Sequence, residues 1–337
     1  MLSYRTDSRF CYFLTALILA LAVSSQGLAD DKEDGLDKKA EVAKEEVAKE
    51  VEQPKVESKK VEETPADSTS AQVDKDEEVK SAPQPLFPDK ALEAAVRAVV
   101  FDKRFNQDPL TKDDVAKIPH VIGRGKGIKS LEGLQHCVSL MKIDLEDNEI
   151  SDLKPISELN KLISLSLAGN KIQEISAVKS MVNLQLLDLS RNNIKKIDPV
   201  AGMKNLRDLW IADNQISDLT PISNLPKIWY LDIAKNKVVD LTVVGKLKWL
   251  TTLDITDNQV KDLSALRSLS DLDLLLISKN QIADLGPLAE MCAADSAGER
   301  RFAPYLEVYL GENPIDDGKK TEWINQLKSA GVDVFEK

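Results

Sequence analysis

The chain has 337 residues and a net charge of −11, a length that allows one large domain or two small ones. The acidic charge is concentrated near the N-terminus, because residues 30–80 hold 18 Asp and Glu against 10 Lys. Residues 1–29 sum to +1, which leaves only −4 on residues 81–337. A body this close to neutral has no basic stripe to neutralise phosphates, so we do not expect nucleic acid as a partner.

The first residues have the composition of an export signal. Two arginines precede an uncharged run from Phe10 to Val23, and small residues lie just before a cleavage point at Asp30. At 14 residues the run is short for a membrane span, which needs about 20. We therefore predict a signal peptide over residues 1–29, no membrane span after its cleavage, and a periplasmic, cell-surface or extracellular location. An N-terminal anchor that stays uncleaved is the alternative.

Residues 30–85 form a separate compositional zone. The motif EVAKE occurs twice in tandem over residues 41–50, and no aromatic residue or isoleucine occurs in the zone. Such a segment has almost nothing to bury, so it cannot offset the entropy cost of ordering. We predict a disordered acidic and lysine-rich linker that holds the folded part away from a surface. A solvated tail with a transient helix is the alternative interpretation.

Residues 86–125 are predicted to form a helical N-terminal cap. Apolar residues recur at helical spacing after Leu86, and Pro88 with Asp89 gives a plausible helix start. A second short helix follows, with Thr111 as its N-cap and Asp114 three residues later. These elements precede a repeat array, at the end where a solenoid needs polar closure.

A repeat of 22 residues occupies the segment 126–315. Its signature asparagines are Asn148, Asn170, Asn192, Asn214, Asn236, Asn258 and Asn280, each 22 residues after the last. The same apolar frame surrounds each one, and a further copy at Asn313 follows an insertion of 11 residues. A degenerate leading copy carries Lys126 in place of the asparagine. This period predicts an α/β solenoid, the leucine-rich repeat horseshoe.

The frame also predicts the role of each of its positions. One repeat cannot bury its apolar side alone, so stacked copies must share a continuous core, with one strand each in a parallel sheet on the concave face. The asparagine amide has two donors and an acceptor, which suit backbone groups that the turn would otherwise leave unpaired. We therefore assign the eight asparagines a structural role as a ladder and no part in binding.

The two cysteines outside the signal are predicted to be free. Cys137 stands in a core column of the frame, and Cys292 lies about seven repeats away. At roughly 4.8 Å per strand this separation exceeds 30 Å, beyond the reach of a disulfide.

Residues 292–302 are interpreted as an irregular solvated loop. Residues 316–337 are predicted to form a closing helix that buries Trp323, with Gly331 just past its end.

The segment LRDLWIADNQISDLTPISNL (206–225) resembles the repeat of secreted bacterial leucine-rich repeat proteins of the internalin type. The resemblance covers residues 86–337. It implies short 3₁₀ turns on the convex side and recognition of a protein by the concave sheet. Neither an immunoglobulin-like module nor an LPxTG motif follows the repeats in this sequence, so we do not extend the resemblance to wall anchoring.

Strand periodicity predicts which side chains face the concave solvent. Counted back from each asparagine, positions three and five are core, whereas positions two, four and six point outward. Large exposed aromatics are typical interface anchors. The predicted partner-binding residues are Trp210, Tyr230, Asp208, Asp232, Asp254, Leu274 and Leu276. The alternative interpretation is that the carboxylates of one outward row only solvate the sheet. That row contains Asp144, Asp188, Asp232 and Asp254.

The predicted function is that of an exported protein that binds another protein through this face. The aspartates favour a partner with Lys or Arg beside an apolar contact. A glycan-binding module and a scaffold component of the cell envelope held by an uncleaved anchor are the alternatives. We expect no enzyme activity, no cofactor and no metal site, because the only histidines, His120 and His136, lie in no catalytic arrangement. Trp229 and Trp249 are interpreted as packing against the turns.

Overall fold

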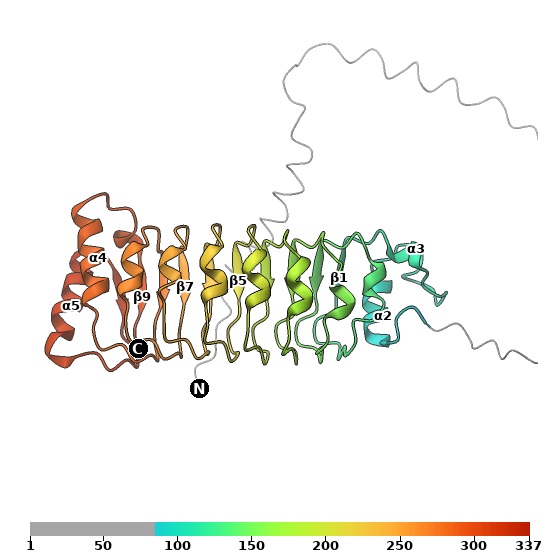
Figure 1. The fold of residues 1–337 in the computed structure, drawn as a ribbon, viewed down its shortest axis with the longest axis horizontal. Coiled ribbons are helices and arrows are strands. Elements are labelled where there is room, and N and C mark those ends of the chain that lie inside the picture. The colour runs from blue at the N-terminus through green and yellow to red at the C-terminus, as the bar shows by residue number, and fades with distance from the viewer. Residues whose placement is uncertain (1–84) are drawn as a thin grey trace, which may run out of the picture. The chain divides into compact units, whose positions relative to one another are not determined.

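The computed structural model describes residues 85–337, so the predicted signal peptide and all but the last residue of the predicted linker lie outside the described residues. The described chain forms one parallel sheet whose ten strands follow each other in sequence order (Figure 1). They are β1 (His120–Ile122), β2 (Lys142–Asp144), β3 (Ser164–Ser166), β4 (Leu186–Asp188), β5 (Asp208–Trp210), β6 (Tyr230–Asp232), β7 (Thr252–Asp254), β8 (Leu274–Leu276), β9 (Glu307–Tyr309) and β10 (Asp333–Phe335). The predicted leucine-rich repeat horseshoe is confirmed.

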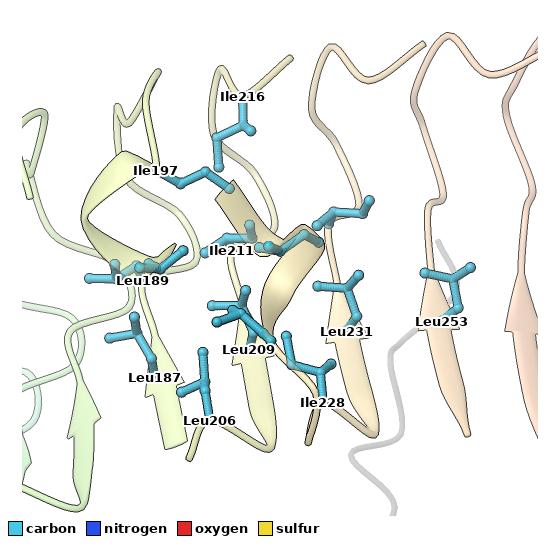
Figure 2. Packing of buried hydrophobic residues seen from close by; sticks show 14 of the residues in the cluster. Leu187, Leu189, Ile197, Leu206, Leu209, Ile211, Ile216, Ile228, Leu231 and Leu253 are labelled. Atoms are coloured by element: carbon cyan, nitrogen blue, oxygen red, sulfur yellow. The ribbon is translucent and has the colours of Figure 1, made fainter. Parts of the chain in front are cut away.

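The strands pair so that equivalent repeat positions lie opposite each other. Leu187 pairs with Leu209, and Leu209 pairs with Leu231. The central residue of each strand from β1 to β9 is buried, because a strand points alternate side chains to opposite faces. In Figure 2, Leu187, Leu209, Leu231 and Leu253 lie on four successive strands with further leucines and isoleucines packed between them. This column is the continuous core that a single repeat could not form alone.

Short 3₁₀ helices form the convex side, as the resemblance implies. They are η1 (Leu134–His136), η2 (Lys154–Ile156), η3 (Ser176–Ser180), η4 (Asp198–Gly202), η5 (Thr220–Asn224), η6 (Val244–Lys246), η7 (Ser264–Ser268) and η8 (Ala303–Tyr305). In η5 the Asp218 carboxylate accepts the backbone N–H of Thr220 at 2.8 Å. Ile222 of the same turn is buried, so each 3₁₀ helix completes the core from the side opposite the strands.

The ladder asparagines bond the backbone at each turn out of a strand. Asn214 accepts the Ile194 N–H at 2.9 Å and donates to the carbonyls of Leu189 at 3.0 Å and Ile211 at 3.1 Å. The residue just before each ladder asparagine has a left-handed φ, as at Asp213 with 52°. These side chains therefore satisfy the polar groups that this sharp turn exposes inside the core.

Two helices and a strand form the N-terminal end. Helix α2 (Lys90–Arg97) begins at Asp89, and α3 (Lys112–Val115) begins at Thr111 with Asp114 completing a capping box, as predicted. The segment predicted as wholly helical also contains β1, which pairs with β2. The Asp89 carboxylate additionally accepts the backbone N–H groups of Lys129 and Ser130, which ties the start of α2 to the first repeat.

The C-terminal end differs from the sequence interpretation in two places. Helix α4 (Gly286–Ala297) includes half of the segment predicted as an irregular loop, and it buries Cys292 beside α5 (Asp317–Ser329). Figure 1 shows α4 and α5 side by side. The Asp295 carboxylate then accepts three backbone N–H groups from residues 301–303 and orders the rest of the insertion. Beyond the predicted closing helix, which buries Trp323, the chain adds β10 to the sheet.

The two described cysteines are free and buried, as predicted. Burial raises the pKa of the Cys137 thiol to about 12, and it raises that of Cys292 to about 12 as well. Both thiols are therefore protonated at neutral pH and act as small apolar core groups.

Candidate functional site

The concave face of the sheet carries two rows of outward side chains, one from each end residue of the strands. The row at the C-terminal ends of the strands passes from Asp188 through Trp210, Asp232 and Asp254 to Leu276, all in register. The row at the N-terminal ends contains Asp208, Tyr230, Thr252 and Leu274. The sheet therefore brings the seven predicted partner-binding residues onto four adjacent strands, β5 to β8.

Trp210 and Tyr230 form the aromatic centre of this face. Their ring centroids are 5.0 Å apart with the planes tilted by 44°, and both side chains are half-buried. Burial raises the pKa of Tyr230 to about 12, against a hydrogen bond between the two side chains that lowers it. We refer to these two residues and the flanking Asp188 and Asp232 as the Trp–Tyr patch.

The two aspartates of the patch and Asp254 on the next strand are half-buried rather than fully solvated. Each accepts the backbone N–H two residues further on, at 3.0 Å for Asp188 and for Asp232 and at 2.8 Å for Asp254. Burial raises the pKa of all three. The pKa of Asp232 reaches about 7, because burial and the charges of Asp254 and Asp188 outweigh the amide bond and nearby Lys235.

Asp144 differs from the rest of its row. The sequence places it among the solvated aspartates, but its side chain is only 5% exposed and holds the Arg124 guanidinium through two bonds of 2.7 Å. Arg124 also lies 3.1 Å from Glu146, which accepts a hydrogen bond from Ser166. Arg124 therefore offsets one of the two negative charges at the β2 end of the row, and the carboxylates of the row that have no arginine bound in this way begin with the half-buried Asp188.

Trp229 contacts Asp208, one of the predicted partner-binding residues, which the sequence interpretation did not anticipate. Its indole N–H donates to the Asp208 carboxylate at 2.6 Å, and the Arg207 guanidinium lies 5.7 Å from its ring centroid. Burial raises the pKa of Asp208, and the bond from Trp229 acts in the opposite direction. Packing of Trp249 against the turns is also wrong, because Trp249 is 61% exposed.

A second apolar area lies at the C-terminal end of the face. Leu276 pairs in register with Tyr309, and Tyr309 pairs with Phe335. The rings of Tyr309 and Phe335 stack with centroids 4.4 Å apart. Phe335 was not among the predicted site residues, because no apolar alternation longer than three residues marks β10.

Within residues 85–337 no group of three or more His, Cys, Asp or Glu side chains is arranged to hold a metal ion. The helices of this part of the chain are too short or too polar for any of them to cross a bilayer.

The fold and its concave face define a leucine-rich repeat protein. Models of the leucine-rich repeat match residues 138–194 and 246–267, and a model of two such copies matches residues 182–227. Leucine-rich repeat proteins of this fold commonly mediate protein–protein interaction and are typically non-enzymatic scaffolds.

Two solved structures give the family. Internalin C2 of Listeria monocytogenes is 36% identical, with a TM-score of 0.59 over 63% of this chain and 96% of that chain. An internalin, InlF, of the same organism is 31% identical, with a TM-score of 0.66 over 77% of this chain and 72% of that one. This chain belongs to the internalin-type family of bacterial leucine-rich repeat proteins.

A leucine-rich repeat protein of Leptospira interrogans shares the fold at 20% identity, with a TM-score of 0.53 over 61% of this chain and 57% of that chain. A search of curated protein sequences gave no significant match.

Proposed function

We propose that this chain is an exported, non-enzymatic protein that binds another protein through the concave face of its sheet. The contact residues are Trp210, Tyr230, Asp208, Asp232, Asp254, Leu274 and Leu276. The observation that supports the proposal most directly is the pairing of two large aromatic side chains, with ring centroids 5.0 Å apart, on an outward sheet face. The export part rests on the uncharged run from Phe10 to Val23 and the small residues before Asp30.

The geometry favours a ligand that inserts an apolar group. Trp210 and Tyr230 lie on adjacent strands, and the position two residues after Trp210 is the small Ala212. Half-burial already restricts both rings, so binding costs them little side-chain entropy. Aromatic anchors of this kind each contribute about 2 kcal/mol or more at protein interfaces.

Charge then selects among apolar ligands. Asp188, Asp232 and Asp254 flank the rings, and Arg124, the cation at the β2 end of the same row, is already paired with Asp144. A ligand with Lys or Arg beside its apolar contact therefore matches the face better than an acidic one.

Affinity capture with the tagged chain from envelope extract and culture medium tests this proposal. The Trp210→Ser/Tyr230→Ser variant runs in parallel, and Trp249→Ser/Tyr305→Ser is the matched control, because those two rings are 61% and 70% exposed elsewhere. We expect a protein that the wild type and the control capture and the patch variant loses. Equal capture by all three would overturn the concave site. If the wild type binds a purified glycan and the patch variant loses that glycan rather than a protein, the sugar-binding alternative is favoured.

The export part has its own measurement. Mass spectrometry of the mature N-terminus should find a chain that starts at Asp30. A chain that retains residues 10–23 would favour the alternative of an envelope scaffold held by an uncleaved anchor.

A further inference from the structure

The loop between α2 and α3 presents an exposed aromatic and cationic tip. Phe105 is 89% exposed and Phe101 is 72% exposed, the two largest values among the exposed large hydrophobic residues of the described chain. The Arg104 guanidinium lies 4.4 Å from the Phe101 ring centroid and 4.8 Å from that of Phe105. Within residues 85–337 no carboxylate lies within 4.0 Å of it. We call Phe101, Arg104 and Phe105 the Phe–Arg knob.

The loop that carries the knob is held in place from within. The half-buried Arg97 guanidinium donates to the carbonyls of Lys103 at 3.4 Å, Asn106 at 3.2 Å and Asp108 at 2.9 Å. Glu93 pairs with the same guanidinium at 2.8 Å. A loop backbone fixed by a charged donor has little backbone entropy left to lose on binding, which lowers the cost of using it as a binding element.

The knob matches the Trp–Tyr patch in both its chemical features. The patch offers aromatic faces and half-buried carboxylates, and the knob offers aromatic rings with an arginine between them. Arginine over Trp or Tyr beside a carboxylate combines a cation–π contact with an ion pair. We propose that the Phe–Arg knob of one copy of this chain docks onto the Trp–Tyr patch of a second copy.

The contact must form between molecules. The patch begins on β4 and β5, and β5 lies four strands from β1, about 19 Å at roughly 4.8 Å per strand. Arg97 holds the knob at the N-terminal end, so it cannot fold back onto its own patch. Two different surfaces meet in this contact, which makes it heterologous: the copy that contributes its knob keeps a free patch, and the copy that contributes its patch keeps a free knob. The product is a ring or an open chain of copies.

This inference rests on the proposed function, because it names a second copy as an occupant of the same face. Sedimentation equilibrium of the full chain at about 0.15 M salt tests it, since that salt screens the net repulsion between copies beyond about 8 Å. We expect the average mass of the wild type to rise with concentration. The knob variant Arg104→Glu/Phe105→Ser and the patch variant Trp210→Ser/Tyr230→Ser should each need at least about tenfold more protein to associate.

Mixing the two variants gives the decisive measurement. The knob variant keeps an intact patch and the patch variant keeps an intact knob, so an equal mixture should form 1:1 dimers and nothing longer. The Trp249→Ser/Tyr305→Ser control should associate like the wild type. A monomeric wild type at all concentrations, association that neither variant weakens, or a mixture that stays monomeric would each overturn the inference.

The outcomes separate this inference from the proposed function. If the wild type stays monomeric while the patch variant still loses a captured protein, the inference fails and the proposed function stands. If the chain associates through the patch and captures no other protein, self-association is supported and the binding of a different protein is not. Binding of phosphatidylglycerol vesicles that only the knob variant loses, with no change in mass, would assign the knob to a lipid surface and overturn the proposal.

Discussion

Replacing Asn214 by alanine should remove one complete step of the asparagine ladder. The Ile194 N–H would lose its acceptor at 2.9 Å, and no other acceptor is within hydrogen-bond reach of that buried group. The carbonyls of Leu189 and Ile211 would each lose one donor but keep another, from Asn192 and Asn236 respectively. An unpaired buried N–H costs about 1–3 kcal/mol and each lost bond about 1 kcal/mol, so we expect a loss of about 3 kcal/mol.

Urea unfolding followed by circular dichroism measures this loss, and Asn193→Ala is the matched control. Asn193 is the neighbouring asparagine of the previous repeat, and its side chain is exposed. We expect the control to lie within about 0.5 kcal/mol of wild type, as surface substitutions do. If Asn214→Ala is no more destabilising than Asn193→Ala at an unchanged m-value, the ladder does not stabilise the turns as argued.

Three further changes test other parts of the structure. Burial raises the pKa of Asp232 to about 7, so its contribution lowers the free energy of unfolding as pH rises from about 4 to 7. Asp232→Asn should stabilise the chain at pH 8 by about 1 kcal/mol or more and flatten the slope in urea titrations at several pH values, with the part due to the raised pKa values of Asp188 and Asp254 remaining. Gly169→Ala should cost about 1–2 kcal/mol in thermal unfolding, because φ is +67° and a Cβ would collide with its neighbours, whereas Gly202→Ala has open space and should be nearly neutral. Cys137 and Cys292 should resist a thiol reagent at pH 8 until denaturant is added, and rapid labelling of the folded chain would contradict their burial.

The sequence predicted the repeats well because their structure is local and periodic. Each strand, ladder asparagine and buried leucine depends on equivalent residues one period away, so the pattern around Asn214 is enough to place Trp210 on the outward face. The helix starts at Asp89 and Thr111 were predictable for a similar reason, since capping residues act within one turn.

The two ends of the array were harder to predict. Strands β1 and β10 have only three residues each, and they form because a neighbouring strand offers an edge to pair with. Helix α4, in which Cys292 is buried, packs against α5, and this is a contact between segments that no repeat relates. The same holds for the bonds of Asp144 with Arg124 and of Trp229 with Asp208, which only the folded sheet brings together.

Different positions of each repeat form the turn, the core and the outward face, and this separation affects which substitutions the fold can accept. The backbone at every turn is bonded by a ladder asparagine, and the core is filled by buried leucines and isoleucines, so the frame that forms the turns and the core lies outside the outward rows. Ser164 and Ser166 occupy on β3 the places that Tyr230 and Asp232 occupy on β6, with the same pairing of their strands. Point substitutions in the outward rows can therefore change binding specificity while the turns and the core keep their residues. The same set of outward side chains can also be transferred to other strands in steps of one 22-residue repeat.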